Sequence, residues 1–176
     1  VLLINNNFEV KVWSYRRDQI EELKATGKSD KLPEIILPKE LQFTDSLKEA
    51  CDTAEVLLLA VPSKATRSTL EAMKPYVNDD KIIVTVTKGI EEKTLFTQSQ
   101  LIEEVLGNNQ RICVLSGPSH AEEVVSLKPT VVVAGSKSKK TAETIQNLFM
   151  NDFFRVYTSP DVTGIEVGAA LKNVIA

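Results

Sequence analysis

The sequence predicts an α/β fold built on a doubly wound sheet, and three observations support this prediction. Short apolar runs typical of buried strands recur along the chain, as in Val-Leu-Leu-Leu-Ala-Val at 56–61. A helical pattern follows nearly every run, and turn-forming residues separate the two. The 176 residues, 43% of them hydrophobic, are enough for a globular domain with its own core. Strands and helices that alternate in this way are typical of a largely parallel sheet with helices on both faces.

The first part of the chain is expected to form helix 1–5, strand 8–13, helix 18–25 and helix 46–53. The asparagines at 5–7 close the first helix, because asparagine tolerates left-handed backbone. Residues 8–13 alternate as a half-buried strand does. Asp18 is the expected cap of the second helix. The prolines within 28–42 predict an irregular segment there.

The rest of the chain repeats strand and helix. The expected strands are 55–61, 81–87, 112–115, 130–134 and 153–158, and the expected helices are 62–76, 92–106, one after Ser119, 138–150 and one opened by Pro160. Ser119 is placed to cap the helix after strand 112–115, with Glu122 at capping-box spacing. The turn Ser-Gly-Pro-Ser at 116–119 should leave backbone N–H groups that suit a phosphate. The candidate domain boundary lies near Ser159.

Composition excludes several classes of function. The net charge of −3 argues against a nucleic-acid-binding surface, and no apolar stretch reaches the roughly 18 residues of a membrane span. Cys51 and Cys113 are not spaced as metal ligands, so no metal is expected, and buried free thiols in a reducing compartment are the better interpretation. The chain starts without methionine and stops within a helical pattern, so we expect a piece cut at both ends.

A Rossmann-like dinucleotide fold carries Gly-x-Gly-x-x-Gly between its first strand and first helix. None of the seven glycines forms this motif, and a helix precedes the first predicted strand. We therefore expect a Rossmann-like sheet truncated at its first strand. Strand 8–13 is then the second strand, and its tip carries Tyr15, Arg16 and Arg17. Since arginine accommodates a 2′-phosphate, the tip predicts use of NADPH at least as readily as NADH; the alternative is two solvated arginines at a helix start.

Five motifs, in order, resemble one family, the NAD(P)-dependent glycerol-3-phosphate dehydrogenases. They are Ala-Val-Pro-Ser at 60–63, Thr-Lys-Gly-Ile-Glu at 87–91, Ser-Gly-Pro-Ser-His-Ala-Glu-Glu-Val at 116–124, Phe-Arg-Val-Tyr at 154–157 and Gly-Ile-Glu-Val-Gly-Ala-Ala-Leu-Lys-Asn-Val-Ile-Ala at 164–176. The resemblance runs over essentially the whole chain and is strongest after Val56. It departs from the family in lacking the glycine-rich loop and most of a carboxyl-terminal helical domain.

The resemblance implies a role for each matching residue. Lys172 matches the catalytic lysine that accepts the proton. Substrate contacts are implied for Lys88, Gly117, Ser119, Lys172 and Asn173, and cofactor contacts for Tyr15, Arg16, Pro62, Lys88 and Ala121. Residues 1–159 would be an incomplete NAD(P)-binding domain, and 160–176 the start of a helical substrate domain.

The function implied by the resemblance is the cytoplasmic interconversion of sn-glycerol 3-phosphate and dihydroxyacetone phosphate with NADP or NAD, by a possible homodimer, for phospholipid synthesis. Because half of the pocket is missing, the isolated chain should be nearly inactive. Two alternatives stay open: a related β-hydroxyacid or ketopantoate-type dehydrogenase, which a substrate panel would distinguish, and a non-catalytic nucleotide-binding module, which an NADPH titration would test.

Simpler interpretations compete with several of these roles. Without the resemblance, Lys172 would be an ordinary solvated helix lysine and Lys88 a strand-end charge. A buried stem for Lys172, next to Leu171 and Val174, would favour catalysis. His120 is expected to enter a helix rather than to catalyse, and Arg67 to lie on a solvated helix face. The catalytic interpretation requires Lys88 and Lys172 to converge on the Ser-Gly-Pro-Ser bend.

Overall fold

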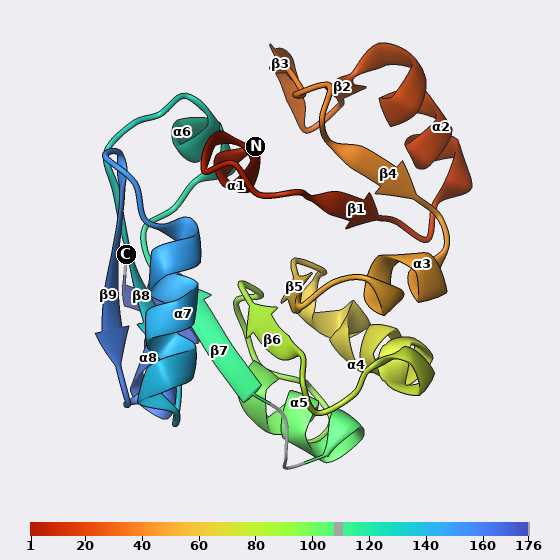
Figure 1. Ribbon diagram of the computed structural model, residues 1–176. Coiled ribbons are helices and arrows are strands. Elements are labelled where there is room, and N and C mark those ends of the chain that lie inside the picture. The colour runs from red at the N-terminus through yellow and green to blue at the C-terminus, as the bar shows by residue number, and fades with distance from the viewer. Residues whose placement is uncertain (108–110, 176) are drawn as a thin grey trace.

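The chain forms a Rossmann-like α/β fold in which helices cover both faces of the main sheet, as predicted (Figure 1). The computed structural model describes residues 1–107 and 111–175, without the side chains of Pro33, Asn173 and Ile175. The strands are β1 (Lys11–Trp13), β2 (Lys28–Ser29), β3 (Leu32–Ile36), β4 (Gln42–Thr44), β5 (Val56–Leu59), β6 (Ile82–Thr85), β7 (Arg111–Ser116), β8 (Thr130–Gly135) and β9 (Phe154–Ser159). The helices are α1 (Leu2–Asn5), α2 (Arg17–Thr26), α3 (Leu47–Asp52), α4 (Ser63–Met73), α5 (Gln98–Leu106), α6 (Ala121–Val125), α7 (Lys139–Phe149) and α8 (Val162–Ile175), with a 3₁₀ turn η1 (Lys74–Tyr76).

The main sheet has the order β5-β6-β7-β8-β9. Strands β5, β6 and β7 run parallel, β8 pairs antiparallel with β7, and β9 runs parallel to β8. Thr85, at the end of β6, lies opposite Leu59 of β5 and Val114 of β7. The carboxyl ends of these three strands therefore meet at one edge, where doubly wound sheets place their ligands.

The sheet separates two apolar cores, and successive residues of β6 point into different ones. Val84 belongs to the core beneath α7, whereas Ile83 belongs to the core beneath α4 and α5; neither side chain is exposed. This burial on both faces explains the continuous apolar run of β6. The corresponding prediction for β5 is wrong at Leu58, which is 41% exposed; Leu57 and Leu59 are buried in the core beneath α4 and α5, and on the opposite face only Val56 packs, half-buried, against the other core.

The segment 28–42 was expected to be irregular, and this prediction is wrong. It contains the antiparallel hairpin β2–β3, and the following β4 pairs in parallel with β1, which places Val12 opposite Phe43. Backbone pairing defines these short strands, so apolar periodicity could not reveal them. Strand β1 is also shorter than the predicted 8–13. That the sheet is truncated at its first strand stays a prediction.

Three helix starts differ from expectation. Helix α2 begins at Arg17, so Asp18 lies in its first turn and is not the cap. Helix α5 begins at Gln98 instead of residue 92, because Thr97 and Gln100 form a capping box there. Helix α6 begins after His120, which is its N-cap. His120 is therefore a helix-entry residue, as expected, and the predicted cap by Ser119 is wrong.

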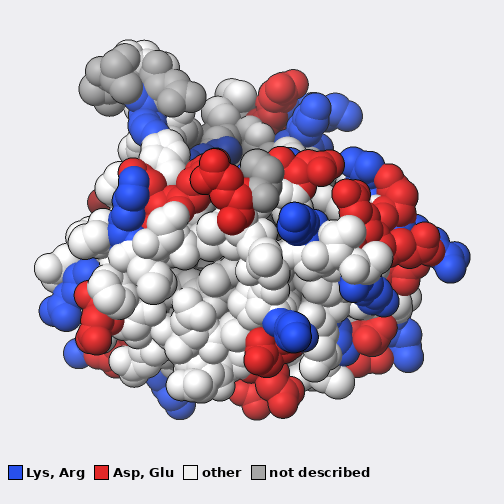
Figure 2. Space-filling view, turned by 90° about the horizontal axis from the view of Figure 1, so that it is seen from above, with Lys and Arg blue, Asp and Glu red and all other residues white. Residues whose placement is uncertain are grey.

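The charged side chains, the two thiols and the apolar character of the helices were each the subject of a prediction from composition. On the face shown in Figure 2, acidic and basic side chains are interspersed around a broad uncharged area. Cys51 and Cys113 are buried free thiols, as predicted. Within residues 1–107 and 111–175, no helix combines the length and apolar character that crossing a membrane requires.

Candidate functional site

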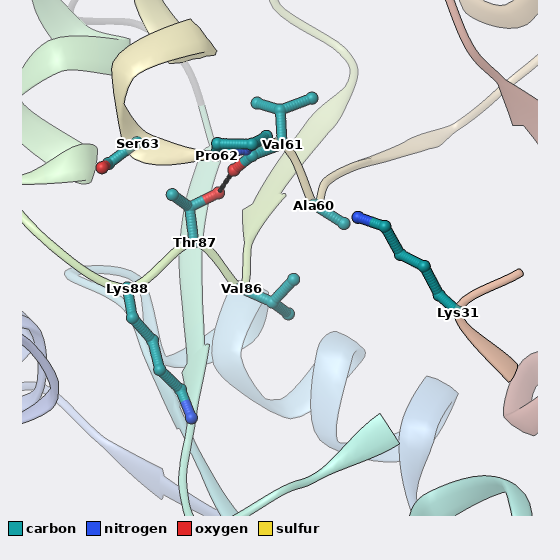
Figure 3. Close-up of a pocket in the computed structure, with 8 residues that line it drawn as sticks. All are labelled: Lys31, Ala60, Val61, Pro62, Ser63, Val86, Thr87 and Lys88. Carbon is teal, nitrogen blue, oxygen red and sulfur yellow. Dashed lines mark hydrogen bonds between the residues drawn. The ribbon is translucent and has the colours of Figure 1, made fainter. Parts of the chain in front are cut away.

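A pocket of about 350 Å³ lies at the carboxyl ends of β5 and β6, within the size range of small-molecule sites (Figure 3). It contains two of the predicted site residues, Pro62 and Lys88. Its lining is completed by residues of the strand ends, the start of α4 and the β2–β3 turn: Lys31, Ala60, Val61, Ser63, Val86 and Thr87.

The turn that carries Lys88 is fixed by hydrogen bonds on both sides. The Thr87 hydroxyl donates to the Val61 carbonyl over 2.8 Å, which ties the ends of β6 and β5 together (Figure 3). Gly89 follows with φ of 114°, a conformation that favours glycine. The buried Gln98 amide donates to the Gly89 carbonyl over 3.0 Å. Lys88 therefore projects from a well-defined backbone.

Lys88 meets the Ser-Gly-Pro-Ser bend, as the sequence predicted. Its Nζ donates to the Gly117 carbonyl over 3.2 Å. Gly117 has no room for a side chain, because a Cβ there would lie 2.5 Å from the Val131 carbonyl oxygen. The bend is therefore pressed against β8, with an ammonium beside it, and this combination can hold an anion.

The bend differs from the predicted capped helix start. The Ser119 N–H donates to the Gly117 carbonyl over 2.9 Å, and the Ser119 hydroxyl lies 3.4 Å from the same oxygen. Ser119 thus closes a tight turn before α6, which has only five residues. Ala121, the predicted cofactor contact, is the exposed first residue of that helix.

Arg67 was expected to be solvated, and this prediction is wrong. Its guanidinium donates to both carboxylate oxygens of Glu91, at 2.6 and 2.7 Å, and to Glu104 at 2.6 Å. Thr94 also donates to Glu91, at 2.5 Å. This Arg67 network joins α4 and α5 to the loop after Lys88. Nothing in the local sequence pattern indicates it.

The Arg67 network predicts a loss of stability in acid. Its guanidinium, helped by the Thr94 hydroxyl, lowers the pKa of Glu91 from 4.5 to about 2. The contribution of the Glu91 carboxylate to the free energy of unfolding is therefore complete above pH 4.5, and it is lost as the pH falls toward 2. We expect Glu91→Gln to lower the Tm at pH 7, and this difference to shrink between pH 4.5 and 2 in thermal unfolding by circular dichroism. Glu71→Gln, an exposed carboxylate on α4, is the control; a Glu91→Gln difference that stays constant with pH would contradict the assignment.

The pocket has the electrostatic character that a dinucleotide requires. Helix α4 begins there with Pro62 as N-cap and no side-chain cap, and Pro62 and Ser63 line the pocket, so the partial positive charge of the helix N-terminus lies beside it. Lys31, from the β2–β3 turn, was not anticipated; its amine points toward Ala60 (Figure 3). Two lysines and a helix N-terminus therefore fit an anionic cofactor.

Tyr15 and Arg16 lie at the carboxyl end of β1, at the start of α2, and Tyr15 is 81% exposed. Arg16 donates to Asp18 at 2.6 Å, and this hydrogen bond lowers the pKa of Asp18. Because both partners are exposed, the pair is weak, and its guanidinium stays accessible.

Lys172 and Asn173 lie near the end of α8. Lys172 is exposed, so the buried stem that would favour catalysis is not seen, and in the described part of the chain it makes no hydrogen bond or ion pair. Its convergence with Lys88 stays a prediction. The side chain of Asn173 lies outside the described residues.

Comparisons with known proteins agree on one family. A family model described as NAD-dependent glycerol-3-phosphate dehydrogenase N-terminus matches residues 1–142. Two curated relatives are named glycerol-3-phosphate dehydrogenase (NAD(P)+). The one from Fusobacterium nucleatum is 49% identical over 100% of this chain and 53% of its own length. The one from Agathobacter rectalis is 50% identical over 100% of this chain and 52% of its own length.

Solved structures show the same fold. The crystal structure of a glycerol-3-phosphate dehydrogenase from Coxiella burnetii has a TM-score of 0.91 and 28% identity, over 99% of this chain and 53% of that one. A ketopantoate reductase from Ralstonia eutropha, with a TM-score of 0.67 and 18% identity over 94% of this chain and 53% of its own, shares the fold alone. The chain spans about half the length of the curated relatives it matches.

Proposed function

The chain belongs to the NAD-dependent glycerol-3-phosphate dehydrogenase family, and from this premise we propose that it serves the interconversion of sn-glycerol 3-phosphate and dihydroxyacetone phosphate with NADPH or NADH. The observation that carries the proposal is the hydrogen bond from Lys88 to Gly117, which unites the strand-end pocket with the Ser-Gly-Pro-Ser bend. A phosphorylated three-carbon substrate fits an ammonium beside this bend.

The proposed reaction transfers a hydride and a proton, and different groups handle each. Bound nicotinamide gives or takes the hydride. Lys172 takes the hydroxyl proton when the alcohol is oxidised and returns it when the ketone is reduced. Lys88, Gly117 and Ser119 hold the phosphate, and Asn173 lies beside the catalytic lysine in sequence. The support for these roles is the motif match together with the contact between Lys88 and the bend.

The cofactor is proposed to lie over the carboxyl ends of the strands. Pro62 at the start of α4 and Lys88 line the pocket, Ala121 follows the bend, and Tyr15 and Arg16 hold the adenosine end. The accessible Arg16 guanidinium supports acceptance of a 2′-phosphate, since its exposed partner Asp18 releases it at little cost.

A coupled spectrophotometric assay on the full-length protein tests the function. Dihydroxyacetone phosphate should oxidise NADPH at 340 nm, and sn-glycerol 3-phosphate should reduce NADP in the reverse direction. Ketopantoate is the matched control substrate and should give no turnover. Turnover of ketopantoate without turnover of dihydroxyacetone phosphate would reject the proposal, and comparing kcat/KM for NADPH and NADH would settle the cofactor preference.

Lys88→Ala should raise the KM for dihydroxyacetone phosphate by about 10- to 100-fold, the value of a charge-assisted hydrogen bond to phosphate. Steady-state kinetics in the full-length protein measure it. Lys93→Ala, an exposed lysine in the same loop, is the control and should leave the KM unchanged. An unchanged KM in Lys88→Ala would remove Lys88 from the substrate site.

The domain boundary, the cellular location, the metabolic role and the oligomeric state are proposed as well. Residues 1–159 would form the cofactor-binding domain, and 160–176 would begin a helical domain; the end of β9 at Ser159 supports this boundary. Two buried free thiols support a reducing, cytoplasmic location. A role in supplying phospholipid precursors, and a homodimer, follow from the family resemblance.

A further inference from the structure

Glu166 on α8 is a buried carboxylate with an unusual partner. It is 6% exposed, and it accepts hydrogen bonds from the Ser99 N–H at 2.8 Å and from the Ser99 hydroxyl at 2.6 Å. Ser99 lies in the first turn of α5, so the carboxylate also faces the positive end of that helix. An apolar side chain would fill this space without the desolvation penalty of a charge. A carboxylate here therefore indicates that the position of α8 relative to the start of α5 has to be fixed by directed hydrogen bonds.

The same first turn of α5 holds the loop that presents Lys88. Gln98, which precedes Ser99, is 1% exposed and donates to the Gly89 carbonyl over 3.0 Å. Gly89 directly follows Lys88. A continuous chain of contacts therefore runs from α8 through the start of α5 to the Lys88 turn.

Glu166 is also the last buried residue of α8 among those whose side chains the structure describes. Before it, Val162 is buried, and Ile165 lies so close to Gly135 that a Cβ there would meet it at 2.6 Å. After it, Val167, Leu171 and Lys172 are exposed. Lys172 comes six residues later, about 9 Å further along the helix axis. Glu166 is therefore a buried polar anchor of α8 on the way to Lys172, with the half-buried Ala169 and Ala170 between them.

We propose that Glu166 is a positioning residue that fixes the helix of Lys172 relative to the turn of Lys88, through Ser99 and Gln98. The inference rests on the proposed function, because it assigns a purpose to the alignment of two lysines in one reaction. Misplacement of a reacting group by about 1 Å lowers a rate by about 100-fold, so a small shift of α8 would be visible in kcat.

Kinetics of the full-length protein provide the first test. Glu166→Ala should lower kcat by about 10- to 100-fold with the KM for NADPH unchanged. Glu166→Gln should restore kcat to within about threefold, because its amide oxygen can still accept from the Ser99 N–H and its amide NH2 can donate to the Ser99 hydroxyl. Ser99→Ala, which keeps the N–H contact, should have an intermediate effect. Ser46→Ala removes the N-cap of α3 and is the control for general destabilisation. A kcat of Glu166→Ala within about threefold of wild type, or an equal loss in Ser46→Ala, would overturn the proposal.

Amide hydrogen exchange separates this proposal from the proposed function. In Glu166→Ala, exchange should accelerate by about fivefold or more both in residues 168–172 and in the Lys88 loop, 89–97, but not in Ser46→Ala. Acceleration confined to α8 would show that the two elements are not coupled and would overturn the inference. If the wild-type protein failed to turn over dihydroxyacetone phosphate, the proposed function would fail, while exchange would still decide whether Glu166 couples the two segments. Should Glu166→Ala not fold, the same comparison is made with Ser99→Ala.

Discussion

Lys172→Met in the full-length protein is expected to lower kcat for dihydroxyacetone phosphate reduction by about 1000-fold or more, which is within the range of general acid–base catalysis. Methionine keeps an unbranched stem but has no proton to give. Because Lys172 is exposed at the end of α8 and bonded to no described residue, its loss removes no packing or hydrogen bond of the fold. Stopped-flow and steady-state assays at 340 nm measure the loss.

The affinity for the cofactor distinguishes loss of chemistry from loss of binding. The Kd of NADPH, followed by nucleotide fluorescence, should stay within about threefold of wild type, because an interaction made only in the transition state lowers kcat without weakening binding. Lys140→Met, an exposed lysine on α7, is the matched control and should keep full activity. Activity of Lys172→Met within about tenfold of wild type would remove Lys172 from the acid–base role.

Lys81→Met is expected to produce the largest loss of stability, about 3 kcal/mol. The Lys81 side chain is buried under α3, and its Nζ donates to the carbonyls of Cys51 and Ala54 at 2.7 Å and of Asp52 at 3.5 Å. These carbonyls lie at the C-terminus of α3, where a positive charge is favourable. Methionine fills the space and leaves them without a donor.

Thermal and urea unfolding of the purified protein measure the effect of Lys81→Met, and the Tm should fall by about 6–12 °C. Lys74→Met, which changes an exposed lysine in η1, tests whether the loss comes from burial and should shift the Tm by less than about 2 °C. A loss below about 1 kcal/mol in Lys81→Met would mean that water replaces the ammonium at these carbonyls.

The sequence predicts most of the fold because periodic elements carry local signals. Strand β6 is continuously apolar since both of its faces are buried, and α3 and α7 begin at the serines that cap them, Ser46 and Ser138. The failures have two kinds of cause. The hairpin β2–β3 and strand β4 depend on non-local backbone pairing. The late start of α5 has a local signal, the capping box of Thr97 and Gln100, which the apolar pattern of 92–106 obscures.

The candidate site divides in the same way. Lys88 and Gly117 could be predicted to meet, because they follow β6 and β7, which are parallel neighbours and end at the same edge of the sheet. The partners that fix their geometry could not. Arg67 is 24 residues from Glu91, and Glu166 is 67 residues from Ser99, and neither pair has a spacing that indicates contact. Lys31 reaches the pocket only because an unexpected hairpin carries it there.

The bond between Lys88 and Gly117 also affects the entropy of ligand binding. A free lysine side chain gives up about 2 kcal/mol of rotamer entropy when a ligand immobilises it. Here one N–H of the ammonium is already engaged by a carbonyl, while the other two can still donate. The Lys88 side chain has therefore already lost part of its rotamer freedom before an anion binds, and its amine is preorganised at the bend.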